Sequence, residues 1–111
     1  MTSITFYERD GLLRGFLSSG HADYAAAGYD IVCAAISAQV TCCVNSLESI
    51  AGIAPLVHID EKKASIEALL PEELQDEQLH DCQIILKVLR QGMADLAEAY
   101  PQFIKLGGTS C

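Results

Sequence analysis

One repeat of apolar residues constrains the fold more than any other feature of this chain. Apolar residues recur at alternating spacings of three and four just before Pro101, and they are Leu79, Cys82, Leu86, Leu89, Met93, Leu96 and Tyr100. This period places them on one face of an α-helix, and such a face needs a core to pack against. Proline then ends the helix. The rest of the chain must therefore supply an apolar layer for this helix to cover.

Two pairs of short segments are predicted to supply that layer as β-hairpins. Residues 4–8 and 12–17 alternate around Asp10-Gly11, a strong signal for a two-residue turn. Residues 55–59 and 64–70 alternate less regularly around residues 60–62, and residues 103–106 form a short last strand. Gly15 interrupts the second strand and marks either a bulge or a close approach of another backbone.

A second helix is predicted from residue 31 to about residue 50, with Asp30 as its N-cap and an end near Gly52. No charged residue occurs from Ile31 to Leu47. Because both faces are uncharged, we expect this helix to be buried on nearly all sides. The mainly small residues of one face permit close approach of another element or a second subunit; this face consists of Ile31, Ala35, Ala38, Cys42 and Ser49.

The order of the predicted elements is ββαββαβ, with an acidic linker at residues 71–77. This order predicts an α+β fold in which two helices pack on one side of a largely antiparallel sheet. A length of 111 residues, half of them hydrophobic, suits a single domain over residues 1–111. Residues 107–111 are predicted to be a disordered tail.

Charge and cysteine content argue against several classes of function. The formal net charge of −8 disfavours a nucleic-acid-binding surface and suits a basic partner. No signal peptide is recognisable, and the charge-free run is too short and too polar for a membrane span. Five cysteines without a secretory signal indicate free thiols in the reducing cytoplasm. No zinc-ligand spacing or phosphate-binding glycine loop occurs, so we expect no metal and no cofactor.

Cys33 and His21 form the one constellation suited to catalysis. Cys33 lies three residues after Asp30, in the first turn of the predicted helix, where the helix macrodipole favours a thiolate. A protonated His21 beside it would lower the thiol pKa further, from about 8.5 to between ~4 and ~7. The thiolate would be the nucleophile, and backbone N–H groups of the first turn can form an oxyanion hole. The alternative is a buried cysteine with a packing role alone.

Neighbouring residues have two interpretations each. Asp30 either only caps the helix or also orients His21. Ser37, one turn after Cys33, either hydrogen-bonds to the Cys–His pair or donates back to the carbonyl of residue 33. The long loop at residues 18–30 is a candidate lid. We expect the other thiols and imidazoles to be packing or surface groups: Cys42, Cys43 and Cys82 in packing, Cys111 in the exposed tail, and His58 and His80 on the surface.

The residues around this pair resemble a known family. Its hallmark is similar to Gly20-His21-Ala22, then a variable loop, then Gly28-Tyr29-Asp30-Ile31-Val32-Cys33-Ala34 and Ser37. The family is the bacterial ribosomal-processing cysteine proteases, Prp. The element order and the Tyr100-Pro101 pair before the last strand also resemble this family. The similarity therefore spans nearly the whole chain, and the segment 20–37 is its specific part.

The resemblance implies a homodimeric cysteine endopeptidase, with Cys33 as the nucleophile and His21 as the general base and acid. Gly20, Gly28, Asp30 and Ser37 match supporting positions, and residues 20–30 match a mobile cover over the active site. The implied substrate is a basic ribosomal protein precursor, the N-terminally extended form of large-subunit protein number twenty-seven. The alternative is a non-catalytic, dimeric, ribosome-associated binding module. A redox-sensing thiol protein is a third hypothesis, although no resolving cysteine lies near Cys33 in the sequence.

Overall fold

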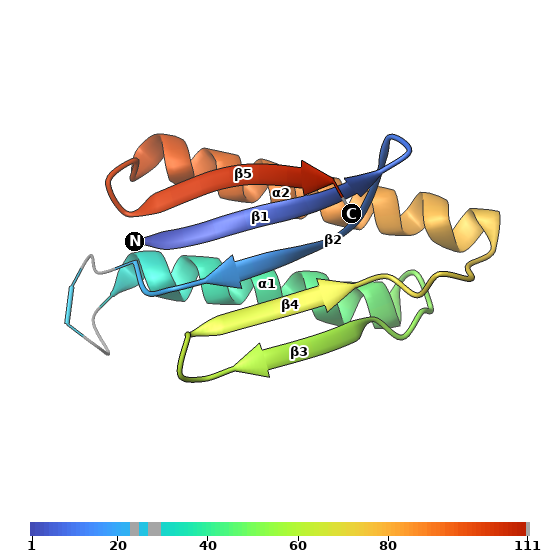
Figure 1. The fold of residues 1–111 in the computed structure, drawn as a ribbon, viewed down its shortest axis with the longest axis horizontal. Coiled ribbons are helices and arrows are strands. Elements are labelled where there is room, and N and C mark those ends of the chain that lie inside the picture. Colours follow the sequence, from blue (N-terminus) through green and yellow to red (C-terminus); the bar gives the residue numbers. More distant parts are fainter. Residues whose placement is uncertain (23–24, 27–29, 111) are drawn as a thin grey trace.

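The computed structural model describes residues 1–22, 25–26 and 30–110. In this part of the chain the elements are β1 (Thr2–Arg9), β2 (Leu12–Ser19), α1 (Ile31–Ser49), β3 (Leu56–Asp60), β4 (Ser65–Leu69), α2 (Asp76–Ala99) and β5 (Ile104–Ser110). The two helices lie on the same face of the sheet (Figure 1). The predicted ββαββαβ order and α+β architecture are confirmed, and so are the two hairpins.

The sheet is mixed, with strand order β3-β4-β2-β1-β5. The pairs β1–β2, β2–β4 and β3–β4 are antiparallel, as the hairpins predict. The last strand, β5, runs parallel to β1, which requires a crossover that α2 provides. The sheet is therefore largely antiparallel, as expected, with one parallel edge.

The end of the chain differs from the prediction. The strand β5 pairs with β1 from Thr2 opposite Ile104 to Glu8 opposite Ser110. The prediction of a disordered tail is therefore wrong for residues 107–110. Two glycines at 107 and 108 have low strand propensity, but hydrogen bonding to a neighbouring strand overrides it. Cys111 lies outside the described residues.

The core lies between the sheet and the helices. Phe6 and Phe16 are almost fully buried on the sheet side, with ring centroids 6.2 Å apart. The predicted apolar face of α2 supplies the helix side, where Cys82, Leu86, Leu89 and Met93 are buried and Leu79, Leu96 and Tyr100 are partly buried against them. The alternating spacing in the sequence therefore identified the packing face correctly.

Helix α1 is buried on one face only. That face consists of Val32, Ile36, Val40, Cys43 and Leu47, whereas Ile31, Ala38 and Cys42 on the other side are exposed. The expectation of burial on nearly all sides is wrong, because the described residues place no further layer over the helices. With 19 residues and a mean hydropathy of 1.4, α1 is long and apolar enough to cross a membrane by these two criteria. The charge-free run from Ile31 to Leu47 was expected to be too short and too polar for this. Core helices of water-soluble proteins meet the same criteria.

Strand β2 contains an irregularity where both interpretations of Gly15 hold. Tyr7 pairs with Gly15 while Glu8 pairs with Leu13, so Arg14 is the extra residue of a bulge. A Cβ atom on Gly15 would lie 2.1 Å from the Ala68 carbonyl oxygen, which shows how closely β4 approaches. Only glycine fits this position.

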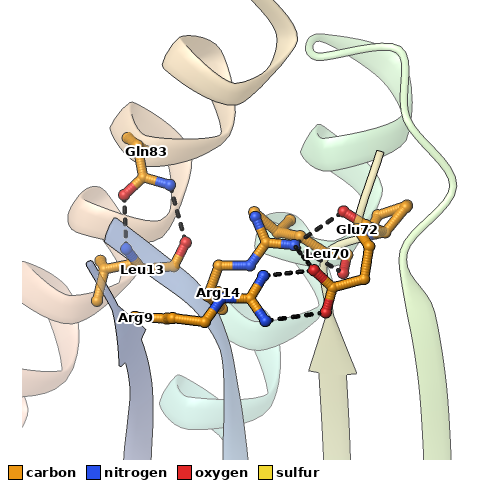
Figure 2. A network of polar contacts seen from close by, with 7 residues as sticks. Arg9, Leu13, Arg14, Leu70, Glu72 and Gln83 are labelled. Atoms are coloured by element: carbon orange, nitrogen blue, oxygen red, sulfur yellow. Dashed lines mark hydrogen bonds and ion pairs between the residues drawn. The ribbon is translucent and has the colours of Figure 1, made fainter. Parts of the chain in front are cut away.

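Polar side chains hold the backbone on both sides of this bulge (Figure 2). The Gln83 amide of α2 accepts from the Leu13 N–H at 2.7 Å and donates to the Leu13 carbonyl at 2.8 Å. Arg14 is buried and donates to the Pro71 carbonyl at 2.9 Å, and its guanidinium lies 3.6 Å from the Glu72 carboxylate. Arg9 also pairs with Glu72. The bulge thus ties β2 to α2 and to the linker that precedes it.

Candidate active site

Cys33 lies in the first turn of α1, and Asp30 is the N-cap of that helix. One Asp30 oxygen, Oδ1, accepts from the backbone N–H groups of Val32 and Cys33, each at 3.0 Å. These donors have no partner inside the helix, so the carboxylate satisfies them. The predicted capping role is confirmed. Orientation of His21 by the same side chain stays a prediction.

The cap has a consequence for the predicted oxyanion hole. The N–H groups of Val32 and Cys33 donate to the Asp30 side chain, and the N–H of Ala34 donates to the Asp30 carbonyl at 3.1 Å. The expectation that first-turn N–H groups form the oxyanion hole stays a prediction, and at these three residues the hydrogen bonds to Asp30 compete with it. A backbone donor outside these three residues would not compete with the cap.

Such a donor comes from the segment that follows β2. The backbone N–H of Ala22 donates to Cys33 Sγ, with 3.3 Å between nitrogen and sulfur. Ala22 is only 1% exposed, and Cys33 is partly buried. Sequence reasoning missed this contact, because a backbone donor leaves no signature beyond its place in the Gly20-His21-Ala22 motif.

Gly20 fixes the start of that segment. Its φ of +91° lies in a region that residues with a side chain rarely adopt, and a Cβ there would lie 2.7 Å from the Met1 carbonyl oxygen. Its N–H is shared between the carbonyls of Lys63 and Ala64, at 3.2 and 3.1 Å, and its carbonyl accepts from the Thr2 hydroxyl at 3.2 Å. These contacts hold the backbone that leads directly into His21 and Ala22.

Cys33 and His21 line one groove of about 410 Å³. Ser37 lines the same groove, and His21 is exposed to solvent. The groove lies between the first half of α1 and the turn that joins β3 to β4, at the end of the sheet where the chain begins (Figure 1). The structure therefore places Cys33, His21, Ser37 and Gly20 along the same groove, and their catalytic and supporting roles stay predictions.

The opposite wall of the groove is a feature that sequence reasoning missed. It comes from the second hairpin and contains Ile59, Asp60, Glu61, Ala64, Ser65 and Ile66. This hairpin reaches the site because β4 pairs with β2, with Ile66 opposite Ser18. That pairing joins distant segments, so no local pattern announces it. Two acidic residues, Asp60 and Glu61, thus line the groove, and Asp60 Oδ1 accepts the backbone N–H groups of Lys62 and Lys63 in the turn.

The other cysteines and histidines that the structure describes lie outside the groove. Cys43 and Cys82 are buried as predicted, and burial raises the pKa of both thiols, that of Cys43 to about 12. Cys42 is exposed, so its predicted packing role is wrong: it lies on the uncovered side of α1. His58 and His80 are exposed, as expected.

Some predicted features fall outside the described residues. Gly28 is one of them, and the expected lid at residues 18–30 includes residues 23–24 and 27–29, which the structure does not describe. Within the ranges that it does describe, no group of three or more His, Cys, Asp or Glu side chains is placed to hold a metal ion.

Comparison with known families decides the class of protein. The family model described as "Cysteine protease Prp" matches residues 1–105. The chain belongs to the Prp family. A Prp relative from Bacillus subtilis (strain 168), named ribosomal processing cysteine protease, is 29% identical over 96 residues, covering 84% of this chain and 86% of the relative. A relative of the same name from Staphylococcus aureus (strain Mu50) is 27% identical over 97 residues, covering 87% and 88%.

Solved structures share the fold over nearly the full length. The S. aureus Prp crystal structure with a covalently linked product peptide gives a TM-score of 0.87 at 25% identity, covering 98% of this chain and 100% of that one. The crystal structure of SMU.848 from Streptococcus mutans gives 0.84 at 28% identity, covering 100% and 96%. The resemblance seen in the motif is therefore confirmed, and the chain is a member of a cysteine protease family with the Prp fold.

Proposed function

We propose that this protein is an endopeptidase that removes the N-terminal extension of large-subunit ribosomal protein number twenty-seven, with Cys33 as nucleophile and His21 as general base and acid. The observation that carries the proposal is the setting of Cys33. Its sulfur lies in the first turn of α1, accepts the Ala22 N–H and shares one groove with His21. A helix N-terminus favours the thiolate, which is the reactive form of cysteine.

The proposed reaction passes through a thioester. Cys33 gives its proton to His21, and the Sγ thiolate attacks the carbonyl carbon of the scissile peptide. The new S–C bond forms and the carbonyl electron pair moves to oxygen. When the carbonyl reforms, the C–N bond breaks and His21 gives its proton to the leaving amine. His21 then takes a proton from water, whose oxygen attacks the thioester carbon. Collapse releases the carboxylate product and the Cys33 sulfur.

The substrate class is supported by the groove and by the relatives. The B. subtilis and S. aureus relatives are named for ribosomal processing, and an S. aureus structure holds a covalently linked product peptide. In this chain the formal net charge is −8, and the acidic residues Asp60 and Glu61 line the groove. Ribosomal proteins are basic, so these charges favour encounter with such a precursor.

A cleavage assay with matched variants tests the proposed pair. Incubated with the extended ribosomal protein, the Cys33→Ala variant should lose cleavage by a factor of about a thousand or more. His21→Ala should lose a comparable factor. His58→Ala and His80→Ala serve as controls, because both side chains are exposed and lie outside the groove. Cleavage by Cys33→Ala at the wild-type rate would refute the mechanism, and binding without cleavage by the wild type would favour a non-catalytic module.

We also propose that the protein is a cytoplasmic homodimer that inserts into no membrane and binds no nucleic acid directly. The exposed side of α1 carries no charge from Ile31 to Leu47, which supports contact with a second subunit. Free thiols at Cys42, Cys43 and Cys82 support a reducing compartment. Sedimentation velocity over a concentration series should show a dimer. A monomer throughout the series would contradict this part of the proposal.

A further inference from the structure

The groove must stabilise negative charge at two places in turn. Charge lies on Cys33 Sγ before the attack and on the substrate carbonyl oxygen afterwards. The backbone N–H groups of residues 32–34 already donate to Asp30, so in this structure they do not donate to Cys33 Sγ. The Asp30 carboxylate also adds negative charge close to Cys33. A donor from outside these three residues can act on the sulfur and the oxygen without breaking the cap.

We propose that the backbone N–H of Ala22 is a catalytic hydrogen-bond donor, which holds the Cys33 thiolate before the attack and the substrate oxygen during it. This inference rests on the proposed protease function. The N–H already points at the sulfur, 3.3 Å from nitrogen to Sγ, in a residue that is 1% exposed. A donor shielded from water acts more strongly on charge than one in solvent. Ala22 directly follows His21, so one short segment supplies both the proton carrier and the donor.

The position of this donor is fixed before substrate binds. On one side, Gly20 is held by the carbonyls of Lys63 and Ala64 and by the Thr2 hydroxyl. On the other, the Ala22 side chain belongs to the hydrophobic core. The peptide group between them therefore has little freedom to turn away. Preorganisation of this kind is what makes a backbone N–H effective in a transition state.

The Ala22 N–H changes its acceptor from Cys33 Sγ to the substrate oxygen because the negative charge moves between these two atoms. As the S–C bond forms, the sulfur becomes a neutral thioether, which is a weak acceptor. The negative charge moves to the oxygen of the attacked carbonyl group, which is two bonds from the sulfur. The Ala22 N–H then donates to that oxygen. When the carbonyl reforms, the amine leaves with the proton from His21, and after hydrolysis the N–H again donates to the Cys33 thiolate.

A single-atom change of the backbone tests this role. Replacing Ala22 by lactic acid through semisynthesis turns the amide N–H into an ester oxygen and keeps the methyl side chain. The matched control is the same replacement at Ala54, an exposed residue in the loop before β3. We expect the Ala22 ester to lower kcat for precursor cleavage by about 100-fold to 1,000-fold, with KM little changed. Iodoacetamide labelling of Cys33 should also shift to higher pH in this variant alone.

Several outcomes would overturn the inference. Wild-type kcat in the Ala22 ester would do so, and so would an equal loss in the Ala54 ester. Return of the lost kcat when the Ala22 ester is cooled to temperatures where it is as fully folded as the Ala54 ester would assign the effect to packing. If the wild type fails to cleave the precursor, the proposed function fails, whereas the labelling profile still reports on the donor.

Discussion

At the scale of single residues, three cysteines of α1 show how position decides the chemistry of one side chain. Cys33 lies in the first turn and accepts a backbone N–H, Cys43 is buried against the core, and Cys42 is exposed. Cys42 and Cys43 are adjacent in sequence, but successive residues of a helix diverge by about 100°, so only one faces the core. Composition alone treats these thiols as equivalent.

Thiol reactivity should separate Cys42 from Cys43. Burial raises the pKa of Cys43 from 9.0 to about 12, so this thiol stays protonated and unreactive in the folded protein at pH 8. At concentrations below those at which the proposed dimer forms, iodoacetamide should therefore modify Cys42 and spare Cys43 until the protein is unfolded, as peptide fragmentation in a mass spectrometer would show. Native labelling of Cys43 as fast as Cys42 would contradict its burial.

The same pKa shift predicts an alkaline loss of stability. Cys43 ionises more readily in the unfolded chain, so its contribution is fully present below pH 9 and is lost as the pH rises toward 12. A Cys43→Val variant cannot ionise, so its free energy of unfolding should fall less between pH 8 and pH 10. Urea denaturation at a series of pH values measures this difference, and parallel curves for the two proteins would refute it.

At the scale of elements, the N-cap of α1 links helix stability to the active site. Asp30→Ala removes both bonds to the first turn and should lower the free energy of unfolding by about 1 kcal/mol. Asp30→Asn keeps a capping oxygen, so its stability should stay near that of the wild type. It also removes a negative charge near Cys33 and should not slow cleavage. Slower cleavage by the stable Asn variant would show that Asp30 also orients His21.

The contact between α2 and the bulge of β2 should be more costly to break. Gln83→Leu leaves the buried N–H and carbonyl of Leu13 without their amide partner, at about 1–3 kcal/mol for each group. Gln91→Leu is the matched control, because its amide donates only to Asp95 at the surface. Urea denaturation should show a large loss for the first variant and little change for the second. Equal losses would mean that the Leu13 contacts add nothing specific.

Local patterns predicted the elements whose cause is local. The spacing in α2, the Asp30 cap of α1 and the Asp10-Gly11 turn each act within a few residues, and each was predicted correctly. The extension of β5 and the exposed side of α1 depend on which elements lie beside them. The sequence alone therefore led to wrong predictions for the tail and for the burial of α1. The site divides in the same way. Cys33 was identified by its place in a helix, whereas Ala22 and the hairpin wall with Asp60 depend on the folded backbone.

At the scale of the whole molecule, the groove with Cys33 and a group of stabilising ion pairs lie at opposite ends of the sheet. The groove with Cys33 lies at one end, by the β3–β4 turn, and the Arg9, Arg14 and Glu72 contacts lie at the other end, by the β1–β2 turn (Figures 1 and 2). The strands β2 and β4 connect the two ends. None of the residues at the far end lines the groove, so we expect them to affect folding rather than cleavage.

Glu72→Gln tests this separation through its pH dependence. The hydrogen bond from Arg9, with the charge of Arg9 and of Arg14, lowers the pKa of Glu72 below its ordinary value of 4.5. The charged carboxylate therefore stabilises the fold above pH 4.5, and this stabilisation is lost as the pH falls through the lowered pKa. Glu72→Gln should melt at a lower temperature than the wild type near pH 7, and the two should converge in acid.

The neighbouring exposed Glu73 gives the control for this experiment, since Glu73→Gln should leave the melting temperature unchanged at both pH values. Cleavage of the ribosomal precursor by all three proteins should proceed at the same rate at temperatures where they are folded. A stability difference that persists unchanged in acid would assign the effect of Glu72 to packing rather than to its charge. Slower cleavage by folded Glu72→Gln would show instead that the two ends of the sheet are coupled, because a rigid β2 would then transmit a change at Arg14 to the segment that carries His21 and Ala22.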